Sequence, residues 1–196
     1  MRDTILIVIA IIGAASAIIG VSLYFALRRT LESTIIKSAE RRISRECRKI
    51  RAQSDIQAGV IDWLGGRLLH AIKKTKRGLK DGGDVLEEEN IIWGKSNLGY
   101  YYAESHKQKP SWHLKKESID LTKVGYDRYN PEESYYNNPD WIDNYIYVRV
   151  AFANTPQEKA ELTELINNLL SRTDLQAIHQ YLAEYLKELA ESPLLL

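Results

Sequence analysis

The chain has 196 residues, of which 44% are hydrophobic and 27% charged, values typical of a folded protein rather than a disordered one. Its formal net charge is only +1, so the chain as a whole is neither strongly basic nor strongly acidic. The single cysteine, Cys47, excludes an internal disulfide framework and a zinc site built from several cysteines.

Residues 5–27 form 23 consecutive positions without a charged side chain. As a helix this segment would span about 35 Å, enough to cross a bilayer hydrocarbon core of about 30 Å. Ala15-Ser16-Ala17 resembles a signal-peptide cleavage site, but the apolar run continues beyond it to Leu27. We therefore predict an uncleaved transmembrane anchor over residues 1–27.

The anchor also carries a face of small residues. Gly13, Ala17 and Gly20 recur at steps of four and three, a spacing at which another transmembrane helix could pack closely.

A basic stalk is predicted at residues 28–53, continuing the helix because no proline or glycine interrupts its first part. Residues 28–80 carry 15 lysines and arginines against 5 acidic residues, whereas residues 81–196 carry 11 against 20. Positive charge beside a membrane helix stays on the cytoplasmic side, so we expect a cytoplasmic C-terminal domain and an outside N-terminus. Residues 28–51 could also bind anionic lipid headgroups. Nucleic acid is not an expected partner, because this stretch lacks interleaved aromatic residues and any reading motif.

Residues 54–196 are predicted to form an all-α cytoplasmic domain. Apolar residues at helical spacing predict one helix from Ile56 to Leu79, ended by Gly82-Gly83. Thr155, Pro156 and Glu158 give the signature of a capped helix start. The other helices are expected over residues 91–102, 112–126, 140–152, 155–169 and 173–189, with a connecting loop at 129–140.

Part of this domain resembles the tetratricopeptide repeat. Leu98 and Gly99, followed by the aromatic Tyr102, match the Leu-Gly pair and aromatic residue of the first repeat helix. Residues 119–131 are similar to the second helix and its closing proline, and the resemblance extends in degenerate form over residues 86–170. It implies antiparallel helix pairs that form a short α-solenoid, with a concave face that binds a peptide or another protein. In such a unit the glycine lets the partner helix approach closely.

No motif predicts catalysis or the binding of a cofactor or metal. The four histidines do not occur at metal-ligand spacing, and Gly82-Gly83 lacks the Lys-Ser/Thr of a phosphate loop. We therefore assign no catalytic, cofactor-binding or metal-binding residue, and we do not expect an enzyme.

Aromatic residues are concentrated between residues 93 and 147, which hold three tryptophans and nine tyrosines. Consecutive tyrosines on a helix cannot all face one core, so some are expected at an interface. The candidate partner-binding residues are Tyr100, Tyr101, Tyr135 and Tyr136. The alternative is that these rings fill the spaces between paired helices.

Three functions fit these observations. The first is a membrane-anchored, non-enzymatic adaptor or scaffold whose helical domain binds a protein or peptide. The second is an accessory subunit of a larger membrane complex, held through its transmembrane helix. The third is a membrane-bound enzyme without a recognisable motif.

Overall fold

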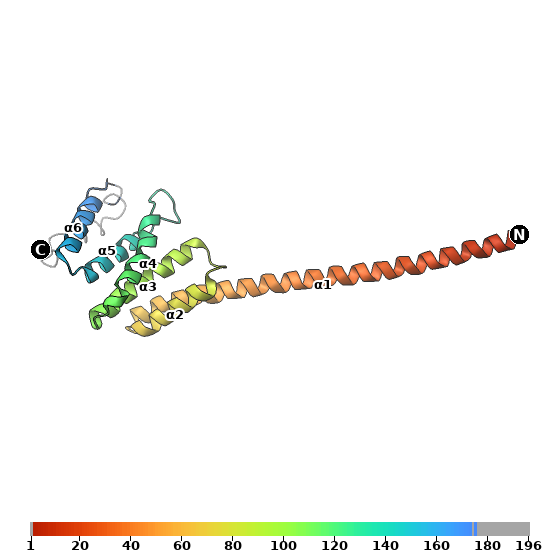
Figure 1. Cartoon of the computed structure of the whole chain (residues 1–196), viewed down its shortest axis with the longest axis horizontal. Coiled ribbons are helices and arrows are strands. Elements are labelled where there is room, and N and C mark those ends of the chain that lie inside the picture. The colour runs from red at the N-terminus through yellow and green to blue at the C-terminus, as the bar shows by residue number, and fades with distance from the viewer. Residues whose placement is uncertain (1, 174, 176–196) are drawn as a thin grey trace. The chain divides into compact units, whose positions relative to one another are not determined.

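The computed structural model describes residues 2–173 and 175, with the backbone alone for residues 2–18. The described part is all-α, as predicted, and holds no strand. Its α-helices are α1 (Arg2–Leu64), α2 (Leu68–Gly82), α3 (Glu88–Gln108), α4 (Lys115–Arg128), α5 (Asp140–Phe152) and α6 (Pro156–Leu170), with a 3-10 turn, η1, at Trp112–Leu114 (Figure 1). Apart from residues 173 and 175, the predicted last helix at 173–189 lies outside the described residues.

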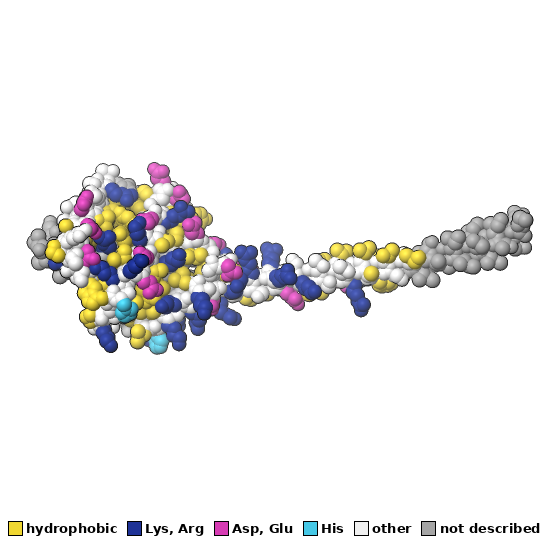
Figure 2. Space-filling model, viewed as in Figure 1, with side chains coloured by type: hydrophobic (Ala, Val, Ile, Leu, Met, Phe, Trp, Pro, Cys, Tyr) yellow, Lys and Arg dark blue, Asp and Glu magenta, His cyan; other side chains and the backbone are white. Residues whose placement is uncertain are grey.

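The chain divides into two compact units, Met1–Cys47 and Arg48–Leu196. In the first unit every described side chain is exposed, from Ile19 to Cys47. Figure 2 shows hydrophobic side chains along this part of α1, followed by the dark blue of Lys and Arg. Among the residues whose side chains are described, no helix is long and apolar enough to cross a membrane. Residues 5–18 of the predicted span lie outside that description, so the membrane anchor stays a prediction.

The helix predicted over residues 56–79 is in fact two helices, and that prediction is wrong. α1 ends at Leu64 and α2 begins at Leu68. Between them Gly66 has a φ of +75°, a conformation that residues with a Cβ rarely adopt. The backbone N–H of Arg67 donates to the carbonyl of Asp62 at 2.7 Å across this turn. Apolar residues keep helical spacing on both sides of the break, so the periodicity concealed it.

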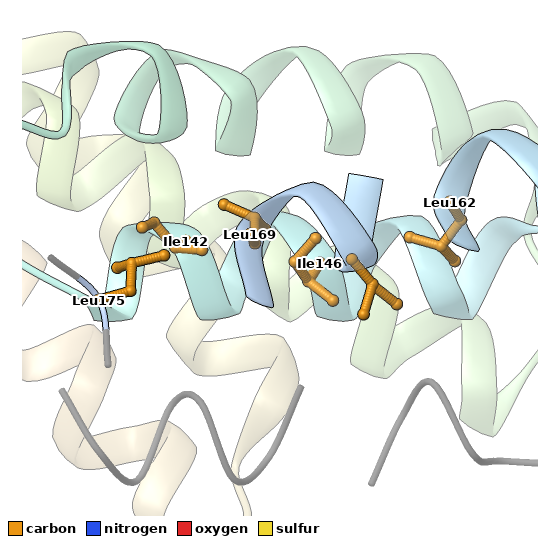
Figure 3. Packing of buried hydrophobic residues seen from close by; sticks show 6 residues of the cluster. Ile142, Ile146, Leu162, Leu169 and Leu175 are labelled. Atoms are coloured by element: carbon orange, nitrogen blue, oxygen red, sulfur yellow. The ribbon is translucent and has the colours of Figure 1, made fainter. Parts of the chain in front are cut away.

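Antiparallel helix pairs build the second unit. The end of α1 pairs with α2, where Arg77 Nε donates to Asp55 Oδ2 at 2.6 Å. α3 pairs with α4, and Arg128 near the end of α4 binds Glu88 at the start of α3, at 3.2 Å. α5 pairs with α6 through the apolar cluster of Figure 3, which includes Ile142, Ile146, Leu162, Leu169 and Leu175.

The predicted cap of α6 is confirmed. The Thr155 hydroxyl accepts the backbone N–H of Glu158 at 3.2 Å, and the Glu158 carboxylate accepts the backbone N–H of Thr155 at 3.2 Å. Lys115, at the start of α4, forms an ion pair with the same carboxylate. This hydrogen-bonded pair is the main reason that the pKa of Glu158 falls to about 2. One carboxylate therefore caps α6 and joins it to α4.

α3 is the central helix of the second unit and contacts α2, α4 and α5. Its backbone comes closest to α4 at Gly99, where an added Cβ would lie 2.7 Å from the carbonyl oxygen of Ser118. The buried Ser118 hydroxyl donates to the carbonyl of Gly99 at 2.6 Å, and Thr122 is also fully buried beside it. The close approach expected at Gly99 is therefore present, although this contact alone does not test the repeat family.

Replacing Gly99 by alanine should lower the free energy of unfolding by about 1–3 kcal/mol, because the new methyl group would push the two backbones apart. Denaturant titration followed by tryptophan fluorescence measures the change. Gly83→Ala is the matched control, since its Cβ would come no closer than 3.4 Å to a neighbouring atom. A Gly99→Ala protein as stable as Gly83→Ala would contradict the close packing of α3 on α4.

Candidate functional site

A pocket of about 300 Å³ lies in the second unit, where α1, α3 and α5 meet. This volume is at the low end of the range for ligand sites and suits a small group rather than a large cofactor. The lining residues are Val60 and Trp63 of α1, Trp93, Asn97, Tyr100 and Tyr101 of α3, and Asp140, Asp143 and Asn144 of α5. We call this set the aromatic pocket.

Helical spacing explains why these side chains converge. On α3, Trp93, Asn97 and Tyr100 stand at positions i, i+4 and i+7, so they project from one face of the helix. On α5, Asp140 and Asp143 lie one turn apart and also share a face. The pocket therefore depends on two helix faces that the packing of α5 against α3 brings together.

Aromatic rings form the walls. The rings of Trp63 and Tyr100 meet edge to face, with centroids 5.3 Å apart and planes at 89°. Tyr101 lies deeper, only 2% exposed, with its ring centroid 6.2 Å from that of Trp63. Tyr100 also contacts Tyr147 of α5 at 4.6 Å between centroids. These contacts fix the ring positions, so the walls are largely formed before any ligand arrives.

Asp143 supplies an unusual charge. Its Oδ1 atom is buried and accepts no hydrogen bond from any residue that the structure describes. Burial, with a smaller contribution from the charge of Asp140, raises the pKa of Asp143 to about 6. The neighbouring Asn144 is satisfied differently, because its amide donates to Ser96 Oγ at 3.1 Å. At neutral pH the pocket therefore holds a half-buried carboxylate whose Oδ1 atom has no hydrogen-bond partner among the described residues.

Among the described residues, the aspartates whose whole side chain is buried each have a cationic partner. Asp62, 4% exposed, forms an ion pair with Lys74 at 2.7 Å and accepts a hydrogen bond from Arg67 at 2.8 Å. The hydrogen bonds from Lys74 and Arg67 lower the pKa of Asp62. Asp55, 8% exposed, is paired with Arg77. Asp143 differs from both because no cation stands beside it within the aromatic pocket.

The four predicted partner-binding tyrosines do not form one surface. Tyr100 and Tyr101 both line the aromatic pocket. Tyr100 is half-buried, whereas Tyr101 is buried in the core, where burial raises its pKa. Tyr135 lies in the connecting loop between α4 and α5, where it is 71% exposed. Tyr136 is half-buried and its hydroxyl donates to Glu88 at 3.1 Å, so it secures the loop. Tyr101 follows the stated alternative of a ring that fills the space between helices, because it is buried against α1 and α2.

The remaining predicted residues belong to the repeat motif and to the small-residue face of the membrane helix. Leu98 and Tyr102 are buried, at 4% and 3% exposure, beside Gly99. An added Cβ at Gly20 would meet nothing within 4 Å, so this part of the small-residue face is open. Gly13 and Ala17 lie among the residues whose side chains are not described.

Sequence reasoning missed the pocket residues Trp63, Trp93, Asn97 and Asp143. Two signals were present: the i, i+4, i+7 spacing on α3, and polar residues inside the otherwise apolar start of α5. Neither shows by itself that the two faces meet, because that contact joins residues more than 40 positions apart.

Of the three histidines that the structure describes, His106 is the buried one, at 7% exposure. Its Nδ1 accepts the backbone N–H of Ser111 at 2.8 Å, and its ring stacks against Phe152 with centroids 4.4 Å apart. Burial lowers its pKa. These contacts hold the turn between α3 and α4 and give the histidine a structural role.

Among the described residues, no group of three or more His, Cys, Asp or Glu side chains could hold a metal ion. No family model, curated protein or solved structure matches the chain. The site must therefore be interpreted from its own geometry.

Asp143→Asn should stabilise the protein at neutral pH. The folded state keeps the Asp143 proton up to a pKa of about 6, whereas the unfolded state releases it near 3.8. The folded state thus binds more protons between these values, and its stability falls as the pH rises through this window. Above pH 6 the variant should exceed the wild type by about 1–2 kcal/mol, with the difference closing near pH 4.

Urea titrations at several pH values measure this difference. Asp127→Asn is the matched control, because Asp127 is exposed and paired with Lys123 on the surface. If the free energy of unfolding depends on pH in the same way for Asp143→Asn and the wild type, burial of the Asp143 carboxylate does not lower the stability.

Proposed function

We propose that the chain is a membrane-anchored, non-enzymatic adaptor or scaffold whose helical domain binds a protein or peptide partner. The observation that carries this proposal is the aromatic pocket. Rigid Trp and Tyr side chains around a small, partly open cavity are typical of a site that captures an anchor residue of a partner.

The arrangement of the helices supports the same function. The pocket is lined by α1, α3 and α5, which are the first members of the three antiparallel pairs. In a tetratricopeptide-like solenoid the first helices of successive pairs line the concave binding face. We therefore propose that residues 86–170, with the α1–α2 pair before them, act as a short repeat-like binding surface.

The N-terminal part would fix the location of this domain. In the proposed arrangement residues 5–27 span the bilayer, and the basic residues of 28–51 lie beside the cytoplasmic leaflet. Their positive charge would be attracted to anionic headgroups there. The stalk side chains of the first unit are exposed and so are accessible to such a surface.

A second candidate function is an accessory subunit of a membrane complex. The open small-residue face at Gly20 favours it, because a neighbouring membrane helix could pack there without a clash. The two functions differ in which part of the chain retains the partner.

Asn97→Trp should remove the partner if the pocket binds it, because the larger side chain would fill the cavity. The full chain with a C-terminal tag is extracted from its native membrane in mild detergent, and co-purifying proteins are quantified by mass spectrometry. We expect the amount of partner that co-purifies with Asn97→Trp to fall about tenfold or more, because the variant would lose a central anchor pocket.

Asn167→Trp makes the same change at an exposed position of α6 and should leave the yield unchanged. A partner that survives Asn97→Trp but is lost in the Gly13→Leu, Ala17→Leu double variant would support the accessory subunit instead. A wild-type chain that retains no stoichiometric protein would contradict both functions.

The orientation can be tested with Cys47, the single cysteine, whose side chain is exposed. If the stalk is cytoplasmic, a membrane-impermeant maleimide should label Cys47 only after the membrane is permeabilised. A Cys47→Ser chain is the control for background labelling. Labelling at full yield in intact cells would place the stalk outside and reverse the proposed topology.

A further inference from the structure

The charge of the aromatic pocket is unbalanced. Asp140 and Asp143 both line it, and its described lining contains no Lys, Arg or His. The buried Oδ1 of Asp143 accepts no hydrogen bond from the described residues. Asp143 is half-buried, and a carboxylate oxygen that is buried without a cation or a hydrogen-bond donor is costly. The fully buried Asp55 and Asp62, in contrast, are both paired with cations. A cation bound in this pocket would supply the positive charge that its lining lacks.

The walls favour the same ligand charge. The face of an aromatic ring carries negative potential and attracts cations within about 6 Å of its centroid. Trp63 and Tyr100 stand nearly at right angles, and Trp93 adds a third ring to the lining. A cation between these rings would gain cation–π attraction from more than one side while it neutralises Asp143.

The geometry also distinguishes arginine from lysine as the ligand of this pocket. A guanidinium pairs best with a carboxylate whose two oxygens are both accessible, because it donates two parallel hydrogen bonds. Oδ1 of Asp143 is buried, so such a bidentate pair is blocked. An ammonium is a compact point charge that needs proximity rather than a planar partner, and its alkyl chain can lie along the rings.

We infer that the aromatic pocket receives the ammonium group of one lysine side chain of the protein partner, an inference that rests on the proposed binding function. The cavity of about 300 Å³ has room for one such chain. The ammonium would lie between the rings of Trp63, Trp93 and Tyr100, with Asp143 as its counter-charge.

The inference is tested with single-residue probes on the full chain in a neutral maltoside detergent. The protein is labelled with 5-fluorotryptophan, and its four tryptophan signals are assigned by single Trp→Phe variants. The probes are Nα-acetyl-lysine methylamide, Nα-acetyl-arginine methylamide and the uncharged Nα-acetyl-norleucine methylamide. The lysine probe should shift the signals of Trp63 and Trp93, with millimolar affinity, and leave those of Trp112 and Trp141 in place.

The norleucine probe should bind about tenfold more weakly or not at all, because it keeps the alkyl chain and lacks the charge. Asp143→Asn should weaken the lysine probe about tenfold, while the exposed Asp127→Asn should not change it. Unchanged signals of Trp112 and Trp141 in each variant establish that the fold is intact.

Three results would overturn the inference: equal binding of lysine and norleucine probes, unchanged lysine binding in Asp143→Asn, or tighter binding of the arginine probe. These outcomes are separate from failure of the proposed function. A partner that is retained by Asp143→Asn and lost by Asn97→Trp would preserve the interaction module and refute the lysine assignment.

Discussion

A helix that packs against three others has little room for large side chains where the backbones meet, and α3 shows how the sequence meets this constraint. Small residues stand at each closest approach: Gly94 toward Leu79 and Ile56, Ser96 toward Asn144, Gly99 toward Ser118, and the fully buried Ala103 beside Val148 and Phe152. Between these positions the same helix carries large rings, of which Tyr101 and Tyr102 are buried. Most of the second unit depends on this alternation, because α2, α4 and α5 are all positioned by contact with α3.

The aromatic pocket follows from that arrangement. Where α1, α3 and α5 meet, the rings of Trp63, Trp93 and Tyr100 do not fill the space completely. Asp143 lines this region although a neutral side chain would cost less, because its Oδ1 atom is buried without a hydrogen-bond partner among the described residues. A protein that retains a half-buried carboxylate with one unpaired buried oxygen gives up stability, which is a pattern more typical of binding sites than of structural cores.

The sequence analysis succeeded where the determining interactions are local. Helical spacing located α3, α4, α5 and α6, and Thr155 with Glu158 located a cap, because each signal involves residues within a few positions of one another. It failed at the Gly65-Gly66 turn, where apolar spacing continued through the break. It also could not separate Tyr100 from Tyr101, or see that Asp143 would face Trp93, because such facts depend on which distant helix covers which face. The membrane and repeat-family predictions rest on patterns that the described contacts do not test.

Glu158 has a consequence for how this unit moves. Its carboxylate accepts the backbone N–H groups of Asn154 and Thr155 and also binds Lys115, so the start of α6 is tied both to its own cap and to α4. Helix ends normally fray first, since their backbone groups have the fewest partners. Here the first turn of α6 cannot open without releasing α4 as well. The amide N–H of Glu158, which donates to the Thr155 hydroxyl, should therefore exchange more slowly than is usual for the first turn of a helix.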